Sequence, residues 1–263
     1  MIDGVTVGLR QLEFALTPAP LRLPDVDVMS IGPADCPRRG DEDEVAALWE
    51  ELRKAFWGVT LSNQRPVPKF EMVTFDHVLD VRSRLRRADT QVSRMSTYRP
   101  FTSLSPQALH RDGYLQRNGD ESWYAGPDAY LMLSDEFVLD HCLGLVRGPG
   151  GSLGVAFEPS PTRKVAEIGG TLWVDGARRL RRIDFTIRNL RFPAGVPPPE
   201  GFISYAEDEP GYWIIDSWRL RMPRVSRINK VVDAGVPWLG RVISVADSVV
   251  GFRETGGYSR RLR

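Results

Sequence analysis

Residues 170–187 carry the clearest strand pattern of the chain and read Gly-Thr-Leu-Trp-Val-Asp-Gly-Ala-Arg-Arg-Leu-Arg-Arg-Ile-Asp-Phe-Thr-Ile. Apolar and polar residues alternate in the segments Thr171–Asp175 and Leu180–Ile187, which flank a turn at Asp175-Gly176. Alternation with a period of two is typical of a strand with one buried face. Asp and Gly both tolerate the positive φ angles of a tight turn. The stretch therefore predicts a β-hairpin.

Two later segments, Phe202–Tyr205 and Tyr212–Leu220, extend the hairpin into an antiparallel meander, because they alternate in the same way. Further strands are expected at Pro66–Arg86 (one long strand), Thr90–Tyr98, Tyr114–Gln116, Ser122–Tyr124, Tyr130–Leu133, Phe137–Val146, Leu153–Glu158, Arg241–Arg253 and Gly257–Leu262. The pattern predicts a mainly β (α+β) fold, with a strongly curved antiparallel sheet or half-barrel of roughly a dozen strands.

One main amphipathic helix is expected over residues 41–57, packed on this sheet. Its apolar residues recur with helical spacing and form a single stripe. They are Val45, Leu48, Trp49, Leu52 and Phe56. The acidic residues 41–44 suit the positive end of the helix dipole, and Gly58 is expected to end the helix. A short helical turn is also expected from Ser105-Pro106 to Gly113, with the serine as cap.

Length and charge exclude several classes of protein. The 263 residues suit one large β-rich domain over residues 31–263, preceded by three short strands in residues 1–30 that need partners. The net charge of +1 gives no global field for nucleic acid. No apolar run is long enough for a transmembrane helix, and the first residues lack the pattern of a secretory signal. No cofactor is expected, and the oligomeric state stays open.

The two cysteines, Cys36 and Cys142, lie far apart in the sequence. If they pair, a loop of this length would contribute roughly 4–5 kcal/mol in the chain-entropy model. Two buried free thiols fit the sequence equally well. The cysteines alone therefore do not settle the compartment.

One motif has the spacing of a hydrolase nucleophile. Gly150-Gly151-Ser152-Leu153-Gly154 matches G-x-S-x-G, which needs a helix after it and a histidine later in the chain. Here a strand-like segment, Val155–Pro159, follows, and all three histidines precede Ser152. A glycine-rich hairpin loop is the better interpretation.

The run Asp140-His141-Cys142 has the residue types of a catalytic triad. Adjacent residues on a strand point to opposite faces, so His141 and Cys142 cannot activate one another directly. On such a strand Asp140 and Cys142 would share a face. A structural histidine beside a buried or disulfide-bonded cysteine is the simpler interpretation.

Asp76 and His77, with Asp80 nearby, are the remaining residues suited to acid–base or metal chemistry. His77 lies on the apolar face of its expected strand, where a hydrogen-bonded core histidine is the usual case. The three histidines show no paired ligand spacing, so no metal site is predicted.

Five aromatic residues of the meander are the candidate ligand-binding residues. They are Trp173, Phe185, Tyr205, Trp213 and Trp218. They can fill a core, and on a strongly curved sheet they can also line a concave apolar cavity. The sequence leaves both alternatives open.

Several motifs also carry a family resemblance. They are Trp123-Tyr-Ala-Gly-Pro-Asp-Ala-Tyr-Leu-Met-Leu-Ser-Asp-Glu-Phe137 with His141-Cys142, Gly154-Val-Ala-Phe-Glu-Pro159, Ile168-Gly-Gly-Thr-Leu-Trp-Val-Asp175, Trp218-Arg-Leu-Arg-Met-Pro223 and Glu254-Thr-Gly-Gly257. Together with the helix residues 47–55 after Cys36, they resemble a family of uncharacterised bacterial proteins with a carboxypeptidase regulatory-like domain. The resemblance spans about residues 20–260.

In such proteins a signal and a transthyretin-like sandwich precede the matching region, and residues 5–28 are similar to the last strands of that sandwich. The resemblance implies a periplasmic or cell-envelope location, although this chain shows no signal peptide. The strand-rich region is more distantly similar to the half-barrel of periplasmic lipoprotein carriers. No catalytic residues come with the family.

Three hypotheses follow. The first is a non-catalytic extracytoplasmic domain that binds an apolar small molecule or an envelope protein on its concave face. The second is an enzyme of unassigned chemistry that uses Asp76, His77 and His141. The third is a purely structural envelope module. A deep cavity lined by the meander aromatics favours the first hypothesis, and a filled concave face favours the third.

Overall fold

The computed structural model describes residues 32–37, 41–62, 70–94, 103–118, 121–190, 196–209, 212–233 and 241–262. The strands expected in residues 1–30 lie outside these ranges, and so does the end of the strand expected over Thr90–Tyr98. Most of the described elements are strands, which confirms the mainly β prediction.

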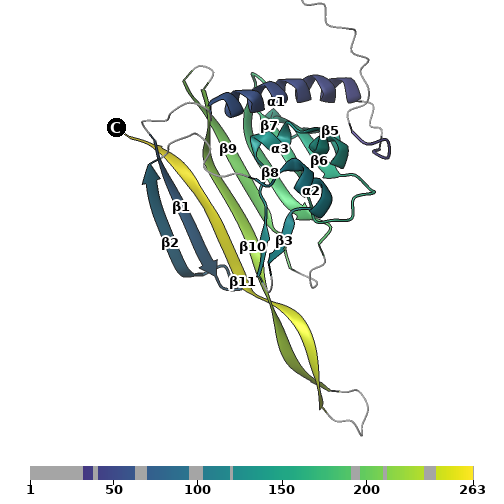
Figure 1. The fold of residues 1–263 in the computed structure, drawn as a ribbon, viewed down its shortest axis with the longest axis vertical. Coiled ribbons are helices and arrows are strands. Elements are labelled where there is room, and N and C mark those ends of the chain that lie inside the picture. The colour runs from purple at the N-terminus through teal and green to yellow at the C-terminus, as the bar shows by residue number, and fades with distance from the viewer. Residues whose placement is uncertain are drawn as a thin grey trace, which may run out of the picture.

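A nine-stranded antiparallel sheet forms the centre of the molecule (Figure 1). The strands are β1 (Phe70–Leu79), β2 (Leu85–Arg94), β3 (Leu115–Asn118), β4 (Glu121–Tyr124), β5 (His141–Arg147), β6 (Leu153–Pro159), β7 (Glu167–Val174), β8 (Leu180–Arg188), β9 (Glu200–Glu209), β10 (Tyr212–Asp233) and β11 (Arg241–Arg261). The order in the sheet is β2-β1-β11-β10-β9-β8-β7-β6-β5, and β3 and β4 pair separately. The sheet is curved and ends at two edges, β2 and β5, so it is not closed.

The predicted hairpin is β7–β8, but its turn differs from a two-residue Asp-Gly turn. Asp175 Oδ1 accepts hydrogen bonds from the backbone N–H groups of Ala177 and Arg179, at 2.9 and 3.0 Å. The residue with a positive φ is Arg178, at 59°, and not Gly176. The chain therefore reverses through a longer loop, in which an aspartate side chain replaces strand hydrogen bonds.

The main helix, α1 (Glu42–Ser62), contacts β5, β6 and β10 and buries the predicted apolar stripe. Its end was predicted wrongly, because Gly58 lies inside the helix. A Cβ atom at Gly58 would stand 3.1 Å from Cδ1 of Trp213 on β10. Glycine at this position therefore allows the helix to approach the indole ring closely.

Three short helices complete the layer on the same side of the sheet: α2 (Pro106–Asp112), α3 (Ala129–Met132) and α4 (Asp135–Asp140). The start and end of α2 were predicted correctly. Ser105 Oγ accepts a hydrogen bond from the N–H of Ala108, and Gly113 caps the other end.

The strand expected at Tyr130–Leu133 is wrong, and the strand expected at Phe137–Val146 is correct only in its second half. The first segment lies in α3, and the second begins in α4 and becomes a strand only at His141. Asp128 accepts a hydrogen bond from the N–H of Leu131, and Ser134 accepts one from the N–H of Phe137. These N-caps start helices where apolar spacing alone suggests strands. Because Asp140 ends a helix, it does not share a strand face with Cys142.

The single long strand expected over Pro66–Arg86 is also wrong, because β1 turns back into β2. Asp80 Oδ1 accepts hydrogen bonds at 2.9 Å from the N–H groups of Arg82 and Arg84, and Ser83 adopts a φ of 59°. This turn contains no Gly or Pro, the residues that mark turns most strongly in a sequence.

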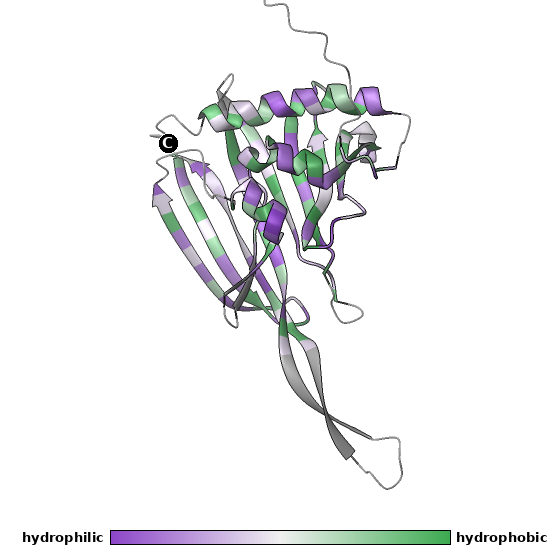
Figure 2. Ribbon diagram, turned by 45° about the vertical axis from the view of Figure 1, so that its right-hand side comes forward, coloured by the Kyte–Doolittle hydropathy of each residue, from purple (hydrophilic) through white to green (hydrophobic). Residues whose placement is uncertain are grey.

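The two faces of the sheet differ in chemistry. The covered face packs against α1 to α4 and is apolar. It includes Ile168, Leu172, Ile183, Phe185 and Ile203. The open face carries the alternate residues of the same strands, and Figure 2 shows the alternating colours along them. These residues include Thr171, Trp173, Arg182, Asp184, Phe202 and Arg219. A bulge between Ile215 and Ser217 keeps the later residues Trp218 and Leu220 on the covered face.

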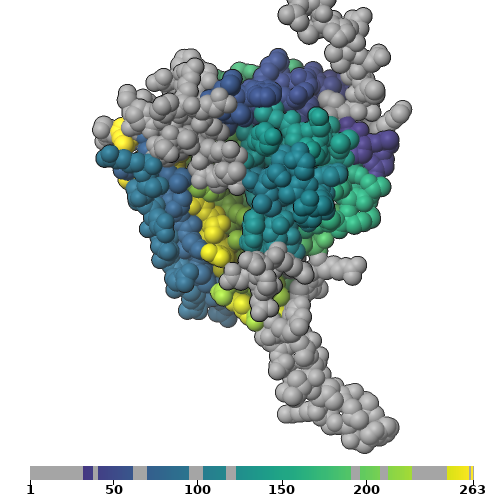
Figure 3. Space-filling model, in the orientation of Figure 1, coloured from purple at the N-terminus to yellow at the C-terminus, as the bar shows by residue number. Residues whose placement is uncertain are grey.

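β10 and β11 are longer than the other strands and stay paired as a hairpin beyond the sheet, up to Asp233 opposite Arg241 (Figure 1). In the space-filling view, β11 atoms are visible between the β1–β2 hairpin and the helical layer (Figure 3). This part of the covered face is therefore not hidden by the described helices.

Candidate ligand-binding site

A cavity of about 210 Å³ lies between the covered face and the segment that ends β4. We call it the inner cavity. Its walls are mainly apolar. They include Leu104, Trp123, Tyr124, Phe185, Trp218 and Leu220. Ser103 and Thr255 add the hydroxyl groups at its border. The composition suits an apolar molecule better than a charged one.

Two glycines, Gly201 on β9 and Gly257 on β11, position the aromatic walls. A Cβ atom at Gly201 would lie 2.5 Å from Cζ of Phe185, and one at Gly257 would lie 2.5 Å from Cη2 of Trp218. The rings therefore lie over bare backbone, which larger residues would not permit.

Asp128 holds the other wall in place. Its Oδ2 accepts a hydrogen bond from the N–H of Ser103 at 3.0 Å, and its Oδ1 accepts one from the N–H of Leu131 at 2.9 Å. The end of β4 is fixed by the N–H of Ala125, which donates to the carbonyl of Tyr114 at 2.9 Å. One buried carboxylate thus joins two wall segments that are distant in sequence.

The structure divides the five candidate aromatic residues into three groups. Phe185 and Trp218 line the inner cavity. Tyr205 and Trp213 are buried in the core and do not line it. Trp173 lies on the open face, where its Nε1 donates to Asp184 Oδ2 at 2.9 Å and its ring lines a second cavity of about 380 Å³. We call this second space the open-face cavity.

The residues of the enzyme hypothesis do not come together. Asp76 binds Arg253, and His77 stacks on Phe75 with ring centroids 4.7 Å apart. His77 is half-buried and is not the core histidine that the sequence suggested. Six strands separate β1, which carries both residues, from His141 on β5. No common cleft can contain all three side chains.

A buried ionic network, which sequence reasoning did not identify, lies between α2, α4 and β7. Asp140 Oδ1 lies 2.9 Å from Nδ1 of the half-exposed His110. Arg163 Nη2 lies 3.3 Å from Asp140 and 2.7 Å from Glu167. Arg163 also donates to the carbonyl of His110 at 2.6 Å. The guanidinium of Arg163 therefore balances the charge of two carboxylates. It also connects the loop before β7 to α2, so the network has a structural role.

His141 lies next to this network and is fully buried. Burial lowers the pKa of His141 to about 4 and raises the pKa of Glu167 to about 7, although Arg163 opposes the second shift. The ring nitrogens of His141 lie 2.8 and 3.0 Å from the carbonyl oxygens of Phe137 and Ile168. A neutral imidazole has one N–H, so only one of these contacts is a hydrogen bond. Neither His141 nor Glu167 lines either cavity.

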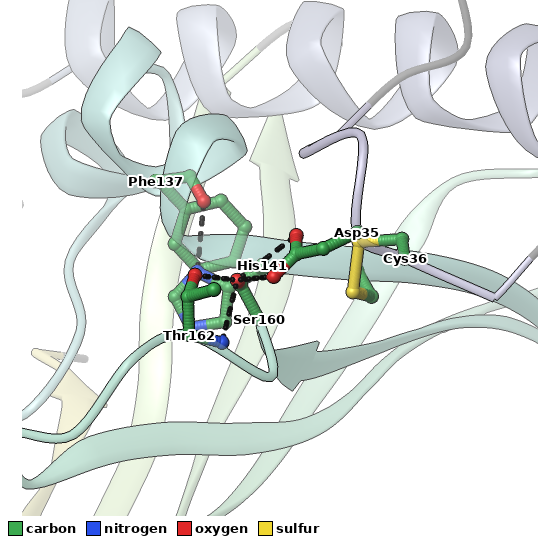
Figure 4. The surroundings of a disulfide bond; sticks show 7 residues. Asp35, Cys36, Phe137, His141, Ser160 and Thr162 are labelled. Carbon is green, nitrogen blue, oxygen red and sulfur yellow. Dashed lines mark hydrogen bonds between the residues drawn. A yellow bond between two sulfur atoms is a disulfide. The ribbon is translucent and has the colours of Figure 1, made fainter.

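The structure joins Cys36 and Cys142 in a disulfide, with Cα atoms 5.4 Å apart (Figure 4). Next to it, Ser160 Oγ donates to Asp35 Oδ2 at 2.9 Å. Both contacts fix residues 32–37 to the region of β5, an edge strand of the sheet. Covering an edge strand protects its unpaired backbone groups.

The G-x-S-x-G motif is the hairpin loop between β5 and β6, as the sequence indicated. Gly150 and Gly151 adopt φ values of 69° and 78°, and Ser152 Oγ donates to the carbonyl of Pro149 at 3.1 Å. A strand and not a helix follows Ser152, so the motif lacks the geometry of a nucleophile elbow.

Within the described ranges, no group of three or more His, Cys, Asp or Glu side chains is arranged to hold a metal ion. Among the helices that the structure describes, none is both long and apolar enough to span a bilayer. Comparisons with protein-family models, curated proteins and solved structures found no match.

Sequence reasoning missed part of the cavity wall. Leu104, Trp123 and Tyr124 come from a loop and a short hairpin, where the sequence period does not indicate the direction in which a side chain points. The motif Trp123-Tyr-Ala-Gly-Pro127 has no strand or helix periodicity. Its dense aromatic content before a glycine and a proline was the available signal.

Proposed function

We propose that this protein binds a small apolar ligand in the inner cavity and does not catalyse a reaction on it. The observation that carries the proposal is the position of Phe185, Trp218 and Leu220, which face an apolar space of about 210 Å³. Concave, mainly apolar surfaces with a few polar groups are typical of small-molecule sites. A purely structural module would be expected to fill this space.

The size of the cavity limits the ligand. Apolar protein cavities of roughly 150 Å³ stay dry and hold benzene. A space of about 210 Å³ therefore suits one small ring or a short acyl segment, and not a complete lipid. Trp123, which is 45% exposed, lies at the border, where a longer molecule could extend into solvent.

An extracytoplasmic location is part of the same proposal. The disulfide between Cys36 and Cys142 supports it, because disulfides persist in oxidising compartments. Fractionation of cells that produce the natural protein tests this part. Thiol labelling of the denatured, unreduced protein should find no free thiol, whereas two titratable thiols would contradict it.

Native mass spectrometry of the freshly purified protein tests the binding function. We expect an apolar adduct that is lost from the variant Leu220→Trp, because the larger side chain fills the inner cavity. The variant Thr186→Val, altered in the open-face cavity, is the matched control and should keep the adduct. A protein without adducts that also fails to take up added apolar compounds would contradict the proposal.

A further inference from the structure

The open-face cavity has a different chemistry, because three arginines line it: Arg182, Arg188 and Arg219. Two of them have a carboxylate partner. Arg182 Nε lies 2.7 Å from Asp184 Oδ1, and Arg188 Nη2 lies 2.8 Å from Glu158 Oε1. These pairs are charge-compensated within the protein.

Arg219 is different. Among the described residues it forms no ion pair, and its buried Nε atom has no hydrogen-bond acceptor. Its guanidinium carbon lies 5.5 Å from the ring centroid of Phe202, and that of Arg182 lies 4.0 Å from the same centroid. Two positive groups therefore flank one aromatic ring, and only one of them has a carboxylate partner.

The neighbouring Arg221 shows what a compensated arginine looks like at an equivalent position. It lies two residues further along β10 on the same face, and its guanidinium carbon lies 4.3 Å from the Phe252 centroid. In addition, Arg221 Nη1 lies 3.3 Å from Glu254 Oε1. Both arginines stack on a phenylalanine, but only Arg221 has an anionic partner.

A partly buried guanidinium without an anion is costly, since burial removes water and nothing replaces its charge. Such an unsatisfied group calls for an explanation, and a bound ion is one. The planar guanidinium fork matches the geometry of carboxylates and phosphates. Two carboxylates also line the cavity, Asp184 and Glu200. Asp184 is already compensated by Arg182 and by the indole N–H of Trp173.

We propose that the open-face cavity binds an oxyanion, either a phosphate or a carboxylate group, through the guanidinium of Arg219. The site lies on the opposite face of the sheet from the inner cavity and is independent of the apolar ligand. Phe185, Phe202 and Arg219 contribute to both walls, so only the sheet separates the two spaces.

The indole N–H of Trp173 reports on this cavity in a ¹H–¹⁵N spectrum. We expect a saturable shift of its signal when sodium phosphate or sodium benzoate is added at constant ionic strength, with a Kd of ~1 mM or tighter. The two probes distinguish a phosphate site from a carboxylate site. Sodium chloride should not cause the same shift.

The variant Arg219→Met should weaken binding of the better probe at least tenfold, which is about 1.4 kcal/mol. The matched control Arg221→Met should change the Kd less than twofold. A wild-type protein that binds neither probe, or a chloride response equal to the others, would overturn the proposal. So would equal binding by Arg219→Met. If that variant does not fold, the wild-type titration still decides.

Discussion

The two faces of β8, β9 and β10 show how one set of strands carries two kinds of surface. On the covered face, Phe185 and Ile203 pack with the helices and border an apolar cavity. On the open face, the adjacent residues Asp184 and Phe202 meet arginines. Side chains alternate along a strand, so neighbouring residues experience opposite environments. The difference between the two sites is therefore set by the face of the sheet toward which each side chain points.

The largest difference in stability should appear between two variants, each of which lacks one aromatic ring, from the covered face or from the open face. Phe185→Ala should destabilise the protein by about 3–5 kcal/mol, because it enlarges a space inside the core. Phe202→Ala should cost clearly less, since its ring is only partly buried and stacks on arginine. Chemical denaturation of both variants measures the difference. Equal losses would show that the two faces are not distinct in packing.

A second difference concerns the pH dependence that arises from two buried residues, His141 and Glu167, whose side chains lie 3.5 Å apart. In the folded protein Glu167 titrates near 7, above the ordinary 4.5, and His141 near 4, below the ordinary 6.5. Between pH 4.5 and 6.5 the folded chain therefore binds one proton more than the unfolded chain at Glu167, and one proton fewer at His141. The two contributions to the pH dependence cancel in this range. Above pH 6.5 only the shifted pKa of Glu167 still contributes to the pH dependence, so the free energy of unfolding falls as the pH rises through 7.

The variant Glu167→Gln should remove this cancellation. Of the two residues, only His141 then titrates. The free energy of unfolding should therefore rise with pH from about 4 to 6.5, by at most ~1.4 kcal/mol per pH unit. Urea unfolding at several pH values measures it. Asp184→Asn on the open face is the control and should keep the wild-type profile. A flat profile in Glu167→Gln would contradict the opposing shifts.

A smaller effect is expected at Gly201, which lies between the Phe185 ring and the backbone of Arg219. Gly201→Ala places a Cβ atom 2.5 Å from the Phe185 ring and 2.6 Å from the carbonyl of Arg219. Overpacking of this kind costs about 1–3 kcal/mol. The ring should move toward the inner cavity, and the tryptophan fluorescence of Trp218 should change. A variant as stable as the wild type would mean that the ring has room to move.

The smallest effect should come from the open-face ion pair. Asp184→Asn removes the partner of Arg182, but both side chains are more than 40% exposed, at 42% and 44%. Exposed pairs contribute roughly 0–1 kcal/mol. Thermal unfolding should therefore differ little from the wild type. A loss comparable to that of Phe185→Ala would mean that the open face is part of the folding core.

Much of the sheet was predictable from the sequence because its strands alternate and its main helix carries one clear stripe. The errors occurred where a single side chain controls the backbone. Asp128 and Ser134 begin helices, and Asp80 closes a turn without glycine or proline. Such hydrogen bonds depend on local geometry, which periodicity does not contain.

The candidate site was predictable only in part. Of the five candidate aromatic residues, Phe185 and Trp218 line the inner cavity, whereas Trp173 lies on the other face. The turn already contained this information. A two-residue turn at Asp175-Gly176 would pair Trp173 with Arg178, and the observed partner is Arg182. Both partners have even numbers and Phe185 has an odd one, so either register places Trp173 and Phe185 on opposite faces.

A titration with toluene tests the account most directly. The methyl signals of Leu220 and Ile203, which line the inner cavity, should shift and saturate in a ¹H–¹³C spectrum. Those of Ile214, in a separate apolar cluster with Phe70, should not move. The variant Leu220→Trp should abolish the response of Ile203. If toluene leaves the cavity methyl signals unchanged in the wild type, or shifts all methyl groups alike, the inner cavity is not an apolar binding site.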